Sequence, residues 1–190
     1  MKFRNIKRII TLCMILSLIV VAVSCGKDGG VYQTTDIKDY GNFVGTYDDE
    51  NLNKYITGFF PDVIQDHFDV VKYSYKAVRG DTISCEAYLE FTIEDEEKFD
   101  LYTSAITNND KTNEFAYDTS FTERVFSDYL QLTSSQEGIE RANIQKILYS
   151  DESNTVIFVF IMVHDGGYTR ADAYDAYFSR FDIDLVEHYG

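Results

Sequence analysis

The feature that most constrains this fold is a strict two-residue alternation of apolar and mostly polar side chains over residues 82–93. The apolar positions are Ile83, Cys85, Ala87, Leu89, Phe91 and Ile93, and the intervening positions are Thr82, Ser84, Glu86, Tyr88, Glu90 and Thr92. Successive side chains of a β-strand point to opposite faces of the sheet. The alternation therefore predicts a strand with one buried face and one solvent-exposed face.

A second alternating segment, residues 68–78, comes directly before this strand. The intervening Arg79-Gly80-Asp81 contains typical turn-forming residues. The two segments predict an antiparallel hairpin over about 68–93, in which lysines of the first strand lie opposite glutamates of the second on the exposed face.

The sequence predicts another hairpin over about 144–163. Its strands are residues 144–149 and 155–163, and a polar turn joins them. The run from Val156 to Val163 is uninterrupted in its apolar character and rich in β-branched and aromatic residues. Such a run is typical of a strand buried on both faces, so we expect it at the centre of the sheet.

A helix is expected after each hairpin. The first begins at the acidic Asp95-Glu96-Glu97 and places apolar residues of 99–106 on one side. The second begins at Thr169-Arg170-Ala171-Asp172, which has the form of a capping box, and continues with an aromatic stripe to Phe181. The predicted fold class is therefore α+β: an antiparallel sheet of two hairpins, each followed by a helix, with the helices packed on one face.

Two further segments have less regular patterns. Residues 51–60 predict a short helix that ends before Pro61, because the residue before a proline disfavours the helical conformation. Residues 108–132 are compatible with a helix or, over 125–133, with an extended strand.

The N-terminus has the organisation of an export signal. Residues 1–8 carry four basic side chains and no acid, and a largely apolar run of 15 residues follows from Ile9 to Val23. As a helix this run spans about 22 Å, less than the roughly 30 Å of a bilayer's hydrocarbon core. It ends in Ala22-Val23-Ser24-Cys25-Gly26, which resembles the lipobox of bacterial lipoproteins.

The resemblance implies that Ser24 is the last residue removed and that Cys25 receives a thioether-linked diacylglycerol, whose acyl chains are fatty acids such as palmitate. It predicts a signal peptide over 1–24, a lipidated cysteine and flexible tether over 25–39, and a single α+β domain over 40–190. The predicted location is the extracytoplasmic face of the cell membrane. An ordinary cleaved signal and an uncleaved N-terminal anchor are the alternatives.

A wider resemblance covers most of the remaining chain. Phe59-Phe60-Pro61, the segment from Tyr88 to Phe99 and the segment from Ile147 to Met162 look like uncharacterised lipoproteins of Gram-positive bacteria. This resemblance implies a cell-envelope location and brings no activity with it.

Charge and motif content narrow the function classes. The chain has a net charge of −15, and loss of residues 1–24, with four basic and no acidic side chains, leaves −19. Such a charge opposes binding to nucleic-acid phosphates. The three histidines, His67, His164 and His188, stand outside known metal-ligand and hydrolase motifs. Cys85 lies on the apolar side of its strand, which predicts a buried and unreactive thiol.

The remaining candidate sites are local. His164 and Asp165 follow the most apolar strand and are candidate metal ligands, although Gly166-Gly167 beside them is typical of a simple turn. Acidic clusters at 48–50, 94–97 and 182–187 are candidate Ca²⁺ ligands without EF-hand spacing, and solvated faces and helix starts also account for them. Arg79-Gly80-Asp81 matches an adhesion motif but also suits a hairpin tip.

The sequence therefore predicts a lipid-anchored, non-catalytic binding or interaction module without a cofactor. Its partner would be an envelope protein, a peptide or a small ligand. The alternatives are an envelope enzyme with an unrecognised carboxylate or Ca²⁺ site, and an acidic immunity or inhibitor protein that binds a basic peptide. An exposed apolar patch or an open sheet edge would favour the binding module, and a concentrated acidic surface would favour the inhibitor.

Overall fold

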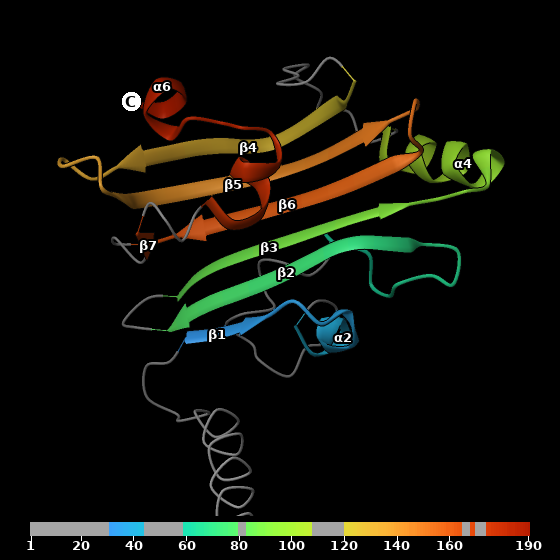
Figure 1. Cartoon of the computed structure of the whole chain (residues 1–190), viewed down its shortest axis with the longest axis horizontal. Helices are drawn as coiled ribbons and strands as arrows, with labels where there is room; N and C mark the ends of the chain where they lie inside the picture. Colours follow the sequence, from blue (N-terminus) through green and yellow to red (C-terminus); the bar gives the residue numbers. More distant parts are fainter. Residues whose placement is uncertain (1–30, 44–58, 80–82, 108–119, 165–167, 170–173) are drawn as a thin grey trace, which may run out of the picture.

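The computed structural model describes residues 31–43, 59–79, 83–107, 120–164, 168–169 and 174–190. These residues form an antiparallel sheet in the order β1-β2-β3-β6-β5-β4, with the short β7 paired to β5 (Figure 1). The strands are β1 (Val31–Thr34), β2 (Asp69–Arg79), β3 (Ile83–Thr92), β4 (Thr122–Leu132), β5 (Gly138–Ser150), β6 (Thr155–Val163) and β7 (Tyr168–Thr169). The helices are η1 (Ile37–Asp39), α2 (Tyr40–Phe43), α4 (Glu96–Thr107), η2 (Tyr174–Phe178) and α6 (Leu185–Tyr189).

The antiparallel sheet and the central position of the apolar run are confirmed. β6 lies between β3 and β5, and each of its residues is buried. β2 pairs with β3, and β5 pairs with β6. In the β2–β3 register Lys72 lies opposite Glu90 and Lys76 opposite Glu86, as the alternation predicts.

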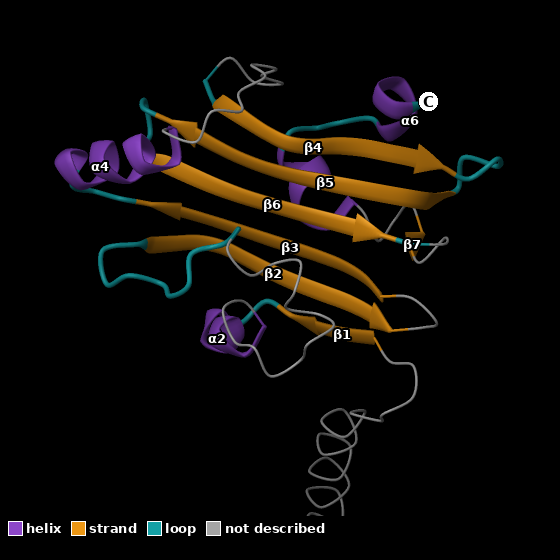
Figure 2. Ribbon diagram, turned by 180° about the vertical axis from the view of Figure 1, so that it is seen from behind, coloured by secondary structure: helices purple, strands orange, loops and turns teal. Residues whose placement is uncertain are grey.

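One side of the sheet, here the first face, carries an aromatic core. Its largest members from the strands are Tyr73, Tyr75, Phe91, Phe158 and Phe160. Tyr40, Phe60, Phe68 and Phe99 pack onto them from the segments before β2 and from α4. Figure 2 shows α4 at one end of this face. The first face is therefore closed by chain that precedes β2 and follows β3.

The opposite side, here the second face, has a separate core. Strand residues such as Tyr88, Ile144 and Val159 pack there against Tyr177, Phe178 and other residues of the C-terminal segment. η2 lies across β5 and β6 on this side (Figure 1).

The prediction that both helices pack on one face is wrong. Phe99 of α4 belongs to the core of the first face, whereas Ala176, Tyr177 and Phe178 of η2 belong to that of the second. The physical reason is β6: because its side chains from Val156 to Val163 are all apolar, both faces of the sheet must be covered. Thr169, the first residue of the expected capping box, lies in β7, and residues 170–172 lie outside the described residues.

Four of the six positions predicted to face solvent in residues 82–93 are buried. Ser84, Glu86, Tyr88 and Glu90 are each at most 6% exposed. They belong to the second face, where Tyr88 joins the core and Glu90 meets Arg180 of the C-terminal segment. Alternation identified which residues share a face, but not that a later part of the chain covers it.

Three further predictions concern residues 31–34, 51–60 and 108–132. Residues 31–34, expected in the tether, form β1 and pair with β2, which gives the sheet an additional edge strand. Of the two possibilities for 108–132, the strand is observed as β4, while residues 108–119 lie outside the described residues. The predicted helix at 51–60 lies mostly outside them as well. No helix among the described residues is long and apolar enough to span a membrane.

Candidate functional site

An aromatic hollow opens on the first face between α4 and β4. Its volume is about 300 Å³. It is lined by Phe59, Phe60, Pro61, Tyr102, Ala105, Ile106, Phe126, Ile147 and Phe158. We use the term aromatic hollow for these nine residues. An apolar recess open to solvent is the feature by which small ligands and apolar side chains of partners are commonly held.

Phe126 is the exposed wall of the aromatic hollow. The β4–β5 register shifts between Val125 and Ser127, so Phe126 is an extra residue in β4. Such a bulge redirects a side chain. Phe126 contacts Phe59 edge to face, with ring centroids 5.4 Å apart, and 41% of its surface remains exposed. A large apolar side chain is thus held partly in solvent by a local irregularity of the strand.

The floor of the aromatic hollow consists of packed aromatic rings. The ring centroids of Phe59 and Phe60 lie 6.0 Å and 5.6 Å from the ring centroid of Phe158. Arg124, buried in β4, donates a hydrogen bond to the carbonyl oxygen of Ile106 and so ties the end of α4 to the sheet. These contacts give the aromatic hollow a preformed shape.

The end of the sheet beside the aromatic hollow is strongly acidic. β2 begins there, β3 ends there, and the turn between β5 and β6 lies beside them, because Asp69 pairs with Thr92 and Thr92 with Thr155. Its exposed acids are Asp66, Asp69, Glu94, Asp95, Glu96, Glu97, Asp100, Asp151 and Glu152. We call this set the acidic end. Within residues 94–100 the one basic side chain is that of Lys98, whose Nζ lies 3.9 Å from Asp95 Oδ2.

α4 connects these two surfaces. Its first half carries Glu96, Glu97 and Asp100, and its second half lines the aromatic hollow with Tyr102 and Ile106. An apolar recess and a concentration of negative charge therefore share one helix.

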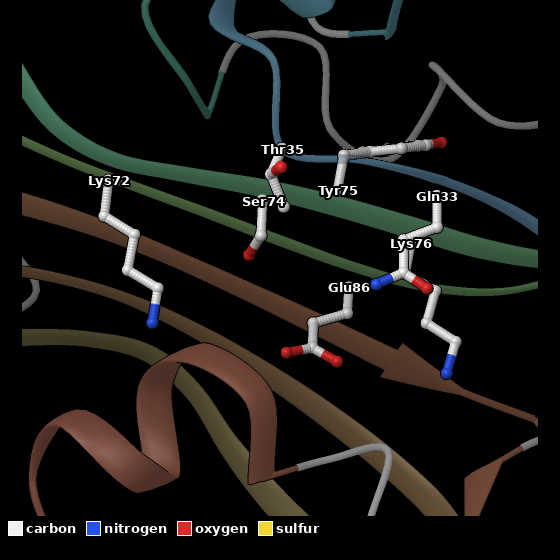
Figure 3. A pocket seen from close by; sticks show the side chains of 7 residues that line it. All are labelled: Gln33, Thr35, Lys72, Ser74, Tyr75, Lys76 and Glu86. Atoms are coloured by element: carbon white, nitrogen blue, oxygen red, sulfur yellow. The ribbon is translucent and has the colours of Figure 1, made fainter.

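A polar pocket of about 280 Å³ lies on the second face, near β1. Lys72, Ser74 and Lys76 of β2 and Glu86 of β3 point to the same side, and Tyr75 points to the opposite one (Figure 3). Lys72 also lies over the ring of Tyr88, 5.5 Å from its centroid. The two ammonium groups and the buried carboxylate make this pocket chemically unlike the aromatic hollow.

A fully buried lysine forms the centre of a third cluster. Lys146 Nζ lies 2.8 Å from Asp128 Oδ2 and 3.2 Å from Glu123 Oε1, and it donates a hydrogen bond to Tyr177 Oη at 3.2 Å. Tyr177 in turn donates to Glu123 Oε1, and Tyr189 donates to Asp128 Oδ1 at 2.7 Å. We call these five residues the lysine cluster. It joins β4 and β5 to the C-terminal segment.

Burial and the neighbouring charges of the lysine cluster act in opposite directions on Glu123. Burial raises the pKa of this carboxyl above its usual range, and the opposing attraction of Lys146 is smaller. Its Oε2 atom accepts no hydrogen bond from the described residues. Tyr189 of the cluster lines a further pocket of about 360 Å³, between the C-terminus and the end of β4. The aromatic hollow and the polar pocket are lined by none of the five residues.

Cys85 lies where the sequence places it. It is fully buried on the first face, and burial raises the pKa of its thiol far above the usual range. A thiol that stays protonated and shielded is a poor nucleophile. The predicted burial of Cys85 is confirmed, and the raised pKa of its thiol supports the expectation that it is unreactive.

The candidate metal ligands are not brought together among the described residues. His164 directly follows β6 and is exposed, and its backbone N–H donates a hydrogen bond to Ser84 Oγ at 3.0 Å. Asp165 lies outside the described residues. His67 precedes β2 at the opposite end of the sheet, and His188 lies in α6. In the part of the chain that the structure describes, no group of three or more His, Cys, Asp or Glu side chains is arranged to hold a metal ion.

The acidic clusters that the sequence offered as Ca²⁺ ligands have helix-capping members. Asp95 Oδ1 accepts a hydrogen bond from the backbone N–H of Lys98 at the start of α4. Asp184 Oδ1 accepts two from Val186 and Glu187 at the start of α6. The cluster at 48–50 and the Gly80-Asp81 part of the adhesion motif lie outside the described residues.

The aromatic hollow is not predicted by the sequence pattern. Phe126 lies in a segment whose secondary structure was undecided, and its exposure depends on a bulge that has no sequence signature. The pair Phe59-Phe60 before Pro61 was the available signal. Comparisons of the chain with protein-family models, with curated proteins and with solved structures find no match.

Proposed function

We propose that this chain is a lipid-anchored extracytoplasmic binding module. The anchor is supported by the basic, apolar and lipobox-like segments that precede Cys25. Two acyl chains on one cysteine meet the requirement of two membrane signals for stable attachment.

The binding site of this module is the aromatic hollow. The observation that carries the proposal is Phe126, whose ring is 41% exposed in the wall of a preformed apolar recess. Large apolar side chains at partly exposed positions characterise the anchor points of binding surfaces. The inert Cys85 and the use of Asp95 and Asp184 as helix caps support a module that binds without catalysis.

The ligand that fits this site is a peptide or protein segment with an apolar side chain next to basic residues. The apolar side chain would enter the aromatic hollow, and the basic residues would lie over the acidic end through α4. Opposite charges steer association and fix orientation more than they add affinity. The concentrated acidic end thus supports the inhibitor-like mode, binding of a basic peptide, within the broader function of a binding module.

The anchor is tested by detergent-phase partition of the full chain produced in a bacterial host. Wild type is expected in the detergent phase and to incorporate labelled palmitate, and the variant Cys25→Ser is expected to lose both properties. The matched control is Cys85→Ser, which alters a buried cysteine far from the signal and should keep both. Labelling of Cys25→Ser at the wild-type level would refute lipidation at this residue.

The binding site is tested with the full chain in detergent against a panel of synthetic peptides. Peptides that combine aromatic or aliphatic residues with lysine are expected to raise the melting temperature, because a ligand of the native state stabilises it. The variant Phe126→Ala should abolish that shift. The control is Leu101→Ala, which removes an apolar side chain that is 67% exposed on α4 outside the aromatic hollow. Equal loss in both variants, or an equal response to acidic peptides, would count against the proposed site.

A further inference from the structure

The distance between the proposed anchor and the first strand is short. Cys25 and Val31 are separated by six Cα–Cα steps. A fully extended chain covers at most about 3.6 Å per residue, so the two Cα atoms lie within about 22 Å of each other. Lipidation of Cys25 would therefore keep the start of β1 close to the membrane surface.

β1 is fixed to one end of the sheet. Val31 pairs with Val78 at the end of β2, and β3 begins beside it because Arg79 pairs with Ile83. β6 ends and β5 begins at the same end, since Met162 pairs with Cys85 and Ala142 with Val163. Figure 1 shows these strand ends, and the turn between β4 and β5, on one side of the sheet. We call this side the anchor end.

The acidic end is the opposite end of the same strands. β3 runs from the anchor end to the acidic end over ten residues, or about 33 Å at 3.3 Å per residue. This length exceeds the reach of the segment between Cys25 and Val31. The sheet is therefore long enough for its two ends to stand at different distances from a membrane.

Charge favours the same orientation. Bacterial membrane surfaces rich in anionic lipids repel a concentration of carboxylates within about one Debye length, roughly 10 Å at 0.1 M salt. The nine exposed acids of the acidic end would meet this repulsion if the sheet lay flat or inverted on the bilayer. The short segment after Cys25 thus keeps the anchor end near the membrane, and the charge of the acidic end disfavours contact between that end and the membrane.

We propose that the anchor end faces the lipid headgroups and that the acidic end, with the aromatic hollow beside it, points away from the membrane. This inference rests on the proposed lipidation of Cys25. The partner of the anchor end is the bilayer surface itself. The arrangement presents the aromatic hollow to soluble or cell-wall-associated molecules rather than to lipids.

The absence of tryptophan from the sequence allows a direct test. Ser135 lies in the turn between β4 and β5 at the anchor end, and Ser153 lies in the turn between β5 and β6 at the acidic end. Both are exposed, and β5 with its 13 residues, about 43 Å of strand, separates them. The variants Ser135→Trp and Ser153→Trp are a matched pair that differs mainly in position along the sheet.

The full lipidated chain carrying each substitution is reconstituted into vesicles of phosphatidylglycerol and phosphatidylethanolamine that contain a dansyl-headgroup lipid. Energy transfer from the tryptophan is expected to be stronger for Ser135→Trp than for Ser153→Trp by about threefold or more, given the length of β5. Flotation of the vesicles first establishes that the protein is bound. Equal transfer in bound protein, or stronger transfer for Ser153→Trp, would overturn the orientation. Failure of wild type to float would instead overturn the lipid anchor, and with it the premise of the orientation.

Discussion

The two faces of the sheet bury side chains of different chemistry. On the first face the buried side chains from β2, β3 and β6 are mainly aromatic and aliphatic, and the rings pack directly on one another. Phe68 and Phe91, for example, are stacked with centroids 4.1 Å apart. On the second face, Lys146, Glu123 and Glu90 are buried together with the apolar residues.

Both faces of the sheet are thus covered, but the chemistry of their buried side chains differs. The first face is stabilised by loss of apolar surface from water and by ring packing. The second also depends on ion pairs and hydrogen bonds to the C-terminal segment, because buried charges are tolerated only when they are paired. We therefore expect the stability of variants on the first face to depend mainly on side-chain size, and that of variants on the second face to depend also on charge and pH.

The largest loss of stability is expected from a ring on the first face. Phe91 is fully buried, stacks on Phe68 and lies 5.7 Å from Tyr102 and 6.3 Å from Phe158. Phe91→Ala removes the ring and leaves a cavity, which should cost about 3–5 kcal/mol in the free energy of unfolding by urea. Phe91→Leu, which retains most of the volume, is the control and should cost distinctly less. A loss below about 1 kcal/mol for the alanine variant would mean that the face repacks freely.

The second prediction concerns the lysine cluster. Lys146→Met leaves Glu123 and Asp128 without their buried cation and should cost about 3 kcal/mol, because a charge deprived of its partner keeps its desolvation penalty. The double variant Lys146→Met with Glu123→Gln should recover part of this loss, and a double-mutant cycle measures the coupling. If Lys146→Met and the double variant were equally destabilised, the pairing of Lys146 with Glu123 would not contribute to the free energy of unfolding. The stability of the second face would then depend on packing alone.

The apolar parts of the fold could be predicted from the sequence because their patterns are local. The run Val156–Val163 indicated a central strand, and the alternation in 82–93 placed Cys85 and Phe91 together on a buried face. Hairpin strands pair with their neighbours in sequence, so their turns and alternation suffice.

The second face could not be predicted in this way. Glu86 and Glu90 have the spacing of solvent-exposed residues. Glu90 pairs with Arg180, which lies 90 positions later in the chain. Glu123 and Lys146 lie on the paired strands β4 and β5, and Tyr177 reaches them from the C-terminal segment, 31 positions after Lys146. The aromatic hollow depends on the bulge at Phe126 and on α4 packing beside β4. These features arise from long-range contacts, which a periodic pattern does not encode.

The third prediction uses the raised pKa of Glu123. Burial makes the native state hold this proton more tightly than the unfolded state, in which the pKa is roughly 4.3. As the pH rises above that value, the unfolded chain loses its proton first, so this group lowers the free energy of unfolding until the native carboxyl has also ionised. Relative to wild type, Glu123→Gln should therefore gain stability as the pH rises through this window.

The measurement is urea unfolding of both proteins from pH 4 to pH 8, reported as the difference between them at each pH. Taking the difference removes the contribution of the other carboxyls. Glu152→Gln, at an exposed position in the turn between β5 and β6, is the control and should show a flat difference. A difference that falls with increasing pH for Glu123→Gln would mean that the native pKa of this residue is lowered instead.

The smallest effect is expected at the exposed edge of the second face. Arg180 Nε lies 3.4 Å from Glu90 Oε1, but the arginine side chain is 40% exposed and therefore screened by solvent. Glu90 keeps a second partner, because Tyr88 donates a hydrogen bond to its Oε2 atom at 2.7 Å. Arg180→Ala should thus cost only about 0.2–1 kcal/mol, and the difference from wild type should shrink in 1 M salt.

The guanidinium also lies over the rings of Phe121 and Phe181, at 5.7 and 5.4 Å from their centroids. Arg180→Lys separates the two contributions: lysine keeps the charge but not the planar contact, so a loss equal to that of alanine would assign the stabilisation to stacking rather than to the ion pair.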